Sequence, residues 1–259
     1  MSYISKEQLF EIENKISSDK SLLGKIYKAK KSENHQISVD HNLVDDYLKD
    51  GYEIDSVLKT KTKLIKPKPH SKRFEDEIWC QFYELGFRTL NIDEKFELPF
   101  GKDPKDKKQI DVIAINDETA IIIECKSSIK PKKAPSYKDE FDVLSLRLDG
   151  FKKTIKQMRG ATIKIKYVFA TRNLRIDPDG VDMERLTKTN SYHHNDNSFQ
   201  YLNSIIKNYK NAASYQFMGL LFKNQLINND KIEIPAVEGE MGGLKYYMFS
   251  IEPGILLKM

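Results

Sequence analysis

Two apolar stretches joined by a short polar link constrain the fold of this chain more than any other feature. They read QIDVIAI at residues 109–115 and AIIIECK at residues 120–126, with NDET between them. Runs of isoleucine and valine of this length favour β-strands, and a short polar link favours a hairpin. Three consecutive isoleucines would fill both faces of the second strand. We therefore expect that strand to lie in the middle of a sheet covered on both sides.

The second strand ends in an acid and a base, Glu124 and Lys126, with Cys125 between them. Side chains alternate along a strand, so Glu124 and Lys126 share one face and Cys125 packs on the other. If the link forms a turn of even length, Asp111 on the first strand faces Glu124, with Cβ atoms about 5 Å apart. Two carboxylates so close repel each other, and burial makes this worse. A divalent cation relieves the repulsion, because carboxylates are ligands suited to Mg²⁺ or Mn²⁺. A cross-strand salt bridge at a sheet edge is the alternative.

An apolar stripe predicts a helix over residues 71–85, with Ser71 as its N-cap and Gly86 as its C-cap. On a helical wheel Glu75 falls inside this stripe, while Asp76 falls outside it. Charged residues seldom lie on a core-facing stripe without a partner, so Glu75 is the acid that we expect to reach the sheet. Alternatively, it is an exposed acid that the helix dipole favours in the first turn. The stripe and its edge consist of Phe74, Ile78, Phe82, Leu85 and Trp79.

The remaining periodicities complete an α/β order. Alternation at residues 95–100 predicts a strand, and apolar residues spaced by three and four predict a helix over 139–160. A further strand is expected at 163–173. The elements therefore run helix, three strands, helix, strand, which indicates an α/β core with a mixed sheet flanked by helices.

Together these residues resemble the PD-(D/E)xK, or restriction-endonuclease-like, nuclease superfamily. The resemblance covers residues 71–172 and consists of the element order, Asp111, and the pair Glu124 and Lys126 at the end of an apolar strand. Glu75 matches the first-helix acid of Holliday-junction-resolvase-like and Mrr-like members. One departure is that no proline precedes the aspartate, which is tolerated across the superfamily.

The resemblance implies a metal-dependent mechanism. Asp111, Glu124, the backbone carbonyl of Cys125 and Glu75 would bind Mg²⁺ or Mn²⁺, which lowers the pKa of a bound water. Lys126 would orient or help deprotonate that water and stabilise the negative charge of the transition state. The catalytic residues implied are therefore Asp111, Glu124, Lys126 and Glu75.

Lysines gather around this motif, although the net charge of +5 is mild. We expect them to hold the phosphate backbone of DNA without reading its sequence. The alternatives are solvated lysine-rich loops and a plain strand-start glutamine. The residues expected to contact DNA are Lys107, Lys108, Lys130, Lys132, Lys133 and Gln109.

Three regions are expected along the chain. Residues 1–68 should form short helices and a basic, proline-containing linker, residues 69–175 the nuclease-like domain, and residues 176–259 an α+β segment. In the last region GEMGG should be a hairpin turn between two strands. Residues 214–222 and 234–259 resemble the start of DGQHR-type proteins, which are related to regulators of DNA phosphorothioate modification, although the DGQHR signature is absent. We therefore expect the chain to be a piece of a longer protein.

Several other classes of protein are disfavoured. No apolar run approaches the length of a membrane span, and the first residues lack the apolar stretch of a secretory signal. Cys80 and Cys125 are far apart and predict no disulfide framework, so a cytoplasmic protein is expected. His193 and His194 are adjacent and are expected in a polar surface loop rather than at a metal.

The sequence therefore predicts a Mg²⁺-dependent DNA endonuclease, in a prokaryotic modification or restriction defence setting. Many such nucleases dimerise to cut both strands, so a homodimer is one expected assembly. The first alternative is a DNA-binding or regulatory module that keeps the nuclease fold and does not cut. The second is a partner-binding protein in a defence complex.

Overall fold

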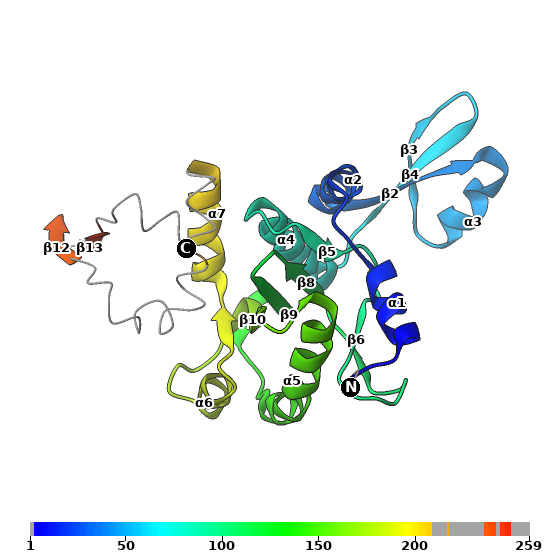
Figure 1. Cartoon of the computed structure of the whole chain (residues 1–259). Helices are drawn as coiled ribbons and strands as arrows, with labels where there is room; N and C mark the ends of the chain where they lie inside the picture. Colours follow the sequence, from blue (N-terminus) through cyan, green and yellow to red (C-terminus); the bar gives the residue numbers. More distant parts are fainter. Residues whose placement is uncertain (1–2, 209–216, 218–235, 242–243, 250–259) are drawn as a thin grey trace. The chain divides into compact units, whose positions relative to one another are not determined.

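The structure is a computed structural model that describes residues 3–208, 217, 236–241 and 244–249 (Figure 1). The chain divides into two compact units, residues 1–214 and 215–259, and each is described by itself. The first unit carries every residue of the predicted site.

A six-stranded mixed sheet forms the centre of the first unit. The two strands of the central hairpin, β8 and β9, are antiparallel, and β9, β10 and β11 are parallel. The expectation of an α/β protein with a mixed sheet flanked by helices is confirmed. In spatial order the strands are β1 (Ile16–Ser17), β5 (Thr89–Asn91), β8 (Val112–Ile115), β9 (Thr119–Lys133), β10 (Lys164–Arg175) and β11 (Tyr192–His194).

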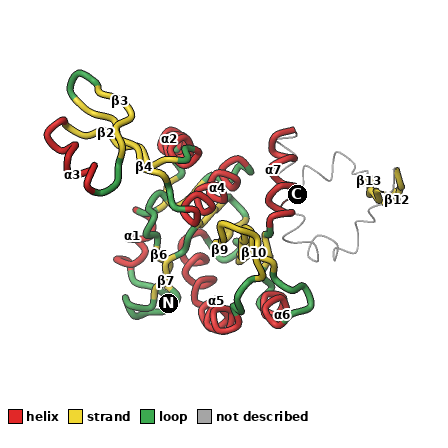
Figure 2. The backbone as a smooth tube through the Cα atoms, turned by 180° about the vertical axis from the view of Figure 1, so that it is seen from behind, coloured by secondary structure: helices red, strands yellow, loops and turns green. Residues whose placement is uncertain are grey.

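Helices cover both faces of this sheet (Figure 2). On one face α4 packs against β8 and β9, and α7 packs against β10 and β11. On the other face α5 buries Phe141, Leu144 and Phe151 in the main apolar core. Both apolar stripes predicted from the sequence are therefore core-facing. The helices are α4 (His70–Glu84), α5 (Lys138–Arg159), α6 (Val181–Lys188) and α7 (Asp196–Asn208).

The ends of α4 differ in how well the sequence predicts them. Gly86 follows the helix with φ +89°, and the amides of Gly86 and Phe87 donate to the carbonyls of Tyr83 and Phe82. This is the Schellman arrangement, in which glycine adopts the left-handed conformation without a Cβ clash. The predicted N-cap is wrong: the helix begins one residue before Ser71, at His70.

The register of the central hairpin is as predicted. Ile115 pairs with Ala120 and Val112 pairs with Ile123. All four residues of β8 and the first six residues of β9 are buried. Because a shift of one residue would move every side chain to the opposite face, this register determines which acids lie together at the end of the hairpin.

The strand expected at residues 95–100 does not join the central sheet. Its ordered part is β6 (Glu97–Pro99), which pairs with β7 (Lys107–Gln109) in a separate two-stranded sheet. The strand that follows α4 in the chain and joins the central sheet is β5 instead. The β6 segment packs against α5, where Gly150 admits the Phe100 carbonyl: a Cβ at Gly150 would lie 2.0 Å from that oxygen.

Residues 1–68 hold strands as well as the expected short helices. β4 runs into the stretch expected to be a basic linker, and its Lys61 and Lys63 are exposed while Thr62 and Leu64 are buried. This alternation is a strand signal that the high lysine content obscures. The elements are α1 (Lys6–Asn14), α2 (Lys20–Lys31), the 3₁₀ helix η1 (His41–Leu43), α3 (Val44–Lys49), and an antiparallel sheet of β2 (Asn34–Asp40), β4 (Lys61–Pro67) and β3 (Glu53–Val57).

The second unit is described in part. β12 (Ala236–Met241) and β13 (Leu244–Phe249) form an antiparallel pair, as the expected hairpin requires, although β12 includes much of GEMGG. Most of the stretches that resemble DGQHR-type proteins lie outside the described residues. The domain boundaries expected at 68 and 175 stay predictions. None of the helices in the described part of the chain is both long and apolar enough to span a membrane.

Candidate active site at the end of the central hairpin

Asp111 lies immediately before β8, at the point where the ladder with β9 ends. One of its carboxylate oxygens, Oδ2, accepts a hydrogen bond of 2.7 Å from the backbone amide of Cys125. The backbone carbonyl of Asp111 accepts from the Asn91 side chain at 3.2 Å. Asp111 is thus tied to the strand that carries Glu124.

Glu124 is the last buried residue of β9, with 8% of its surface exposed. Its carboxylate accepts from two lysines: Lys126 Nζ lies 3.1 Å from Oε1, and Lys108 Nζ contacts Oε2. The contact with Lys126 confirms that the two side chains share one face of the strand. Lys126 also lies 2.9 Å from Oε1 of Glu140, in the first turn of α5. Burial lowers the pKa of Lys126, but Glu124 and Glu140 outweigh it and raise the pKa overall.

Burial and a like charge act on Asp111. Its pKa is raised to about 7, first by burial and then by the negative charge of Glu124. Glu75 raises it further, while the amide of Cys125 and the charge of Lys126 oppose the shift. The contribution of Glu124 is the repulsion between carboxylates that the sequence predicts, and burial is the larger cause of the shift.

Glu75 is half-buried on α4 and pairs with a lysine of its own helix. Lys72 Nζ lies 3.5 Å from Oε2 of Glu75 and 3.0 Å from Oε1 of Glu94. Burial raises the pKa of Glu75, and the charge of Lys72 opposes this. Glu75 thus pairs with Lys72, a lysine that it shares with Glu94.

The expectation for Asp76 is wrong, because this side chain is buried at 1% exposure. It does not contact the sheet acids but receives Lys30 at 2.6 Å and Lys68 at 2.8 Å. Lys68 also donates to the carbonyls of Ala29 and Lys30 at the end of α2. The helical wheel assumes a single buried face, whereas α2 covers a second face of α4.

The residues present fit a hard divalent cation in their chemistry. Asp111 and Glu124 supply carboxylate oxygens, and their mutual repulsion is the feature that a dication would relieve. In residues 3–208 and the other described positions, however, no group of three or more His, Cys, Asp or Glu side chains is arranged to hold a metal. Glu75 thus remains an expected ligand that this conformation does not bring into a three-residue set.

The residues expected to contact DNA fall in three places. Lys108 turns toward Glu124, whereas Lys107 pairs with Glu97 at 2.7 Å. Gln109 is exposed at the end of β7, in a different strand from Asp111, and donates to the Glu94 carbonyl at 3.4 Å. The other three are exposed on the far part of β9: Lys130, Lys132 and Lys133.

Two lysine–carboxylate contacts at Glu124 and Lys126 were not predicted. Lys108 reaches Glu124, and Glu140 holds Lys126. The position of Lys108 depends on the β6–β7 hairpin folding over the site, which no local pattern reveals. Glu140 could have been suspected, because it is an acid in the first turn of the helix that follows the motif.

His193 and His194 do not lie in a surface loop. They belong to β11, and His194 is completely buried with Nε2 2.7 Å from the Gln81 side chain. His193 Nε2 lies 2.9 Å from the Thr171 hydroxyl.

Cys80 is buried too, and burial raises the pKa of its thiol to about 12, which argues against a nucleophile.

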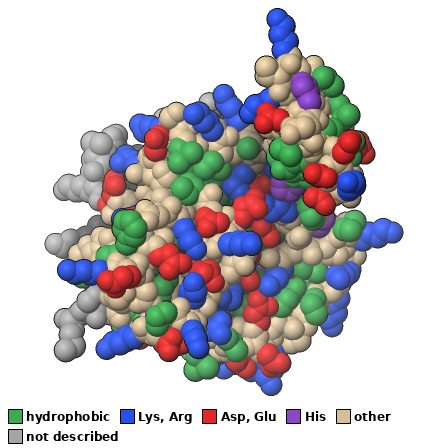
Figure 3. Space-filling model, turned by 90° about the vertical axis from the view of Figure 1, so that its right-hand side faces the viewer, with side chains coloured by type: hydrophobic (Ala, Val, Ile, Leu, Met, Phe, Trp, Pro, Cys, Tyr) green, Lys and Arg blue, Asp and Glu red, His purple; other side chains and the backbone are tan. Residues whose placement is uncertain are grey.

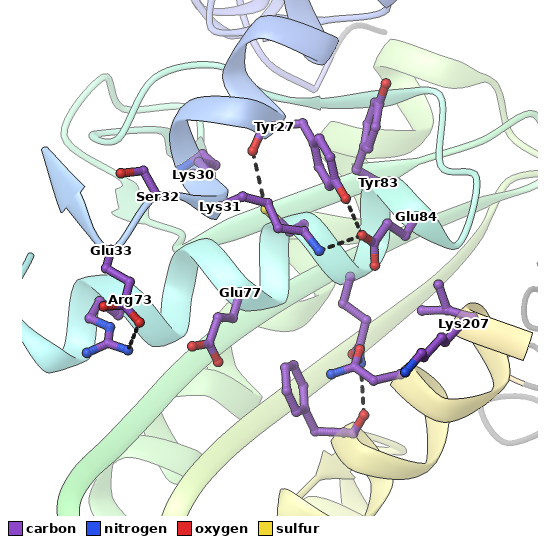
Figure 4. Close-up of a pocket in the computed structure, with 15 residues that line it drawn as sticks. Tyr27, Lys30, Lys31, Ser32, Glu33, Arg73, Glu77, Tyr83, Glu84 and Lys207 are labelled. Atoms are coloured by element: carbon purple, nitrogen blue, oxygen red, sulfur yellow. Dashed lines mark hydrogen bonds and ion pairs between the residues drawn. The ribbon is translucent and has the colours of Figure 1, made fainter. Parts of the chain in front are cut away.

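A groove of about 1030 Å³ lies elsewhere in the first unit, between α2, α4 and α7 (Figure 4). Two ion pairs lie among its lining residues: Lys31 lies 2.8 Å from Glu84, and Arg73 lies 3.3 Å from Glu33. None of the predicted site residues lines it. On the face of the molecule shown in Figure 3, acidic and basic side chains are likewise interspersed.

The geometry defines a mixed α/β protein with a carboxylate and lysine site at the end of its central hairpin. No protein-family model and no curated protein matches the chain. Two solved structures are similar to it: protein VC1899 from Vibrio cholerae, at 11% identity, and Can2 from Sulfobacillus thermosulfidooxidans in complex with cyclic tetra-adenylate, at 12%. Both have a TM-score of 0.32, and each comparison covers 80% of this chain and 56% of the other. This chain therefore spans little more than half their length, and a TM-score so low assigns neither fold family nor activity.

Proposed function

We propose that this protein is a nuclease of the PD-(D/E)xK type that hydrolyses phosphodiester bonds in DNA with the help of Mg²⁺ or Mn²⁺. The observation that carries the proposal is the register of the central hairpin, which ties Asp111 to the strand of Glu124. Burial and mutual repulsion raise the pKa of Asp111 to about 7, an unfavourable arrangement for folding alone.

Each residue has a separate role in this proposal. Asp111 and Glu124 would hold the metal, with the Cys125 carbonyl and Glu75 as further ligands. The metal, when bound, polarises the scissile phosphate and acidifies water. Lys126 remains protonated because Glu124 and Glu140 flank it, so it suits hydrogen bonding to a phosphate oxygen that gains negative charge.

Nicking of supercoiled plasmid DNA tests the proposal. We expect the wild type to cleave with Mg²⁺ or Mn²⁺ and not in EDTA, and Asp111→Asn to lose at least about 100-fold in rate. Asp117→Asn is the matched control, because Asp117 lies on the same hairpin and is exposed, with Arg88 as its partner. Equal cleavage by wild type and Asp111→Asn would reject the site.

A DNA-binding module without cleavage is the second candidate. It is favoured by the two lysines that already neutralise Glu124 and by the lack of a three-residue metal set among the described residues. DNA binding that is unaffected by divalent ions, with no cleavage under any of them, would favour this candidate.

A further inference from the structure

The strand that carries Glu124 and Lys126 has a bulge just beyond them. Ser127 pairs with Arg172, but the next pair in the ladder is Lys132 with Leu174. Residues 128–131 of β9 therefore have a single residue, Asn173, opposite them. Pro131 lies within this bulge and has no amide hydrogen to donate, which suits an interrupted ladder.

Asn173 holds the bulge in place. It has a positive φ of 57°, a conformation that asparagine tolerates better than most residues. Its side-chain amide donates to the carbonyls of Ser128 at 2.9 Å and Ile129 at 3.3 Å. Its backbone amide donates to Asp196 of α7 at 2.8 Å. The bulge is thus fixed by specific hydrogen bonds to its own sheet.

The bulge presents an apolar side chain among positive charges. Ile129 is 76% exposed. From Lys126 to Lys138 the sequence contains five lysines and no acid, and Arg175 is exposed on the neighbouring strand. Ile129 lies three positions beyond Lys126 along β9, and three steps of extended strand span about 10 Å.

We propose that Ile129 is a wedge that enters the base stack of duplex DNA beside the cleavage site, so that the protein selects duplexes that are easily unstacked. This rests on the proposed function and adds a substrate class to it. Apolar side chains flanked by lysines open base steps in this way, at an energetic cost that is smallest where pairing is already weakened. Lys130 and its neighbours would hold the phosphates on either side.

Binding in EDTA tests the wedge separately from cleavage. The probes are two short labelled duplexes, one fully paired and one with a central mismatch flanked by 2-aminopurine. We expect wild type to bind the mismatched duplex about tenfold more tightly and to raise the 2-aminopurine fluorescence. Ile129→Ala should lose both the preference and the fluorescence rise while still binding the paired duplex.

Two variants act as controls. Leu146→Ala removes a comparably exposed apolar side chain, at 84% exposure on α5, and should match the wild type. Lys130→Ala should weaken binding to both duplexes by a similar factor and leave their ratio unchanged. Thermal unfolding verifies that Ile129→Ala is folded.

Each outcome decides a different question. Binding with an unchanged preference and fluorescence rise in Ile129→Ala overturns the wedge and leaves the nuclease proposal intact. An Ile129-dependent preference without any cleavage supports the wedge and rejects the nuclease. A wild type that binds neither duplex rejects both proposals.

Discussion

At the scale of single residues, Glu124 is neutralised by two lysines that differ in origin. Lys126 belongs to the motif, whereas Lys108 comes from the β6–β7 sheet and contacts the other carboxylate oxygen. A cation that binds Glu124 must compete with Lys108. We expect Lys108→Ala to bind Mn²⁺ about three- to tenfold more tightly by calorimetry, because one competing charge is gone. Lys107→Ala, which instead loses a contact with Glu97, should not change Mn²⁺ affinity.

The raised pKa of Asp111 predicts a pH-dependent stability. Its pKa is about 7 when folded against an ordinary value of 3.8, so the folded state holds the proton more tightly. The free energy of unfolding therefore falls as pH rises from about 4 to 7, and this loss persists above pH 7. Asp111→Asn has no carboxyl to ionise, so this loss of stability does not occur in the variant. We expect it to be more stable than wild type at pH 8 by roughly 1–2 kcal/mol, after allowing for partial exposure.

Urea unfolding at pH 5 and pH 8 measures this effect. The stability difference between Asp111→Asn and wild type should be larger at pH 8 than at pH 5. Mg²⁺ at pH 8 should stabilise the wild type and not Asp111→Asn. Parallel pH profiles for the two proteins would contradict the raised pKa.

At the scale of elements, the buried Asp76 joins α4 to α2 and to the end of β4. Lys68 has only 4% of its side chain exposed, so loss of Asp76 would leave a buried ammonium without its carboxylate. We expect Asp76→Asn to lower the free energy of unfolding by about 3–5 kcal/mol in urea. Asp46→Asn, which breaks an exposed pair with Lys49, should change it by less than about 1 kcal/mol. A small effect of Asp76→Asn would mean that Lys68 is satisfied by the carbonyls of α2.

The central elements could be predicted from the sequence because their signals are local. The isoleucine run of β9, the hairpin register and Gly86 after α4 all follow from nearest neighbours in the chain. The burial of Asp76 could not be predicted in this way, because it depends on α2, which precedes α4 by some forty residues. Likewise, the reach of Lys108 to Glu124 depends on how the β6–β7 sheet packs.

At the scale of the first unit as a whole, His194 makes the stability of the unit depend on pH. It is buried where β11 meets α4, and burial, aided by the charges of His193 and Arg172, lowers its pKa to about 3. The unfolded chain binds this proton near pH 6.5, so stability falls as pH drops from 6.5 toward 3, by up to about 1.4 kcal/mol per pH unit. Between pH 6.5 and 5 this amounts to about 2 kcal/mol.

Replacement of the imidazole tests this. His194→Gln keeps a donor for the Gln81 side chain and removes the titrating imidazole. Between pH 7 and pH 5 its free energy of unfolding should therefore fall by about 2 kcal/mol less than that of wild type. His41→Gln, at an exposed histidine of η1, should retain the wild-type slope. Because His194 belongs to β11 and contacts Gln81 of α4, its protonation should destabilise the candidate site along with the core, and cleavage should be lost in the same pH range as tertiary structure. A wild type that loses no more free energy of unfolding than His194→Gln between pH 7 and pH 5 would contradict this coupling.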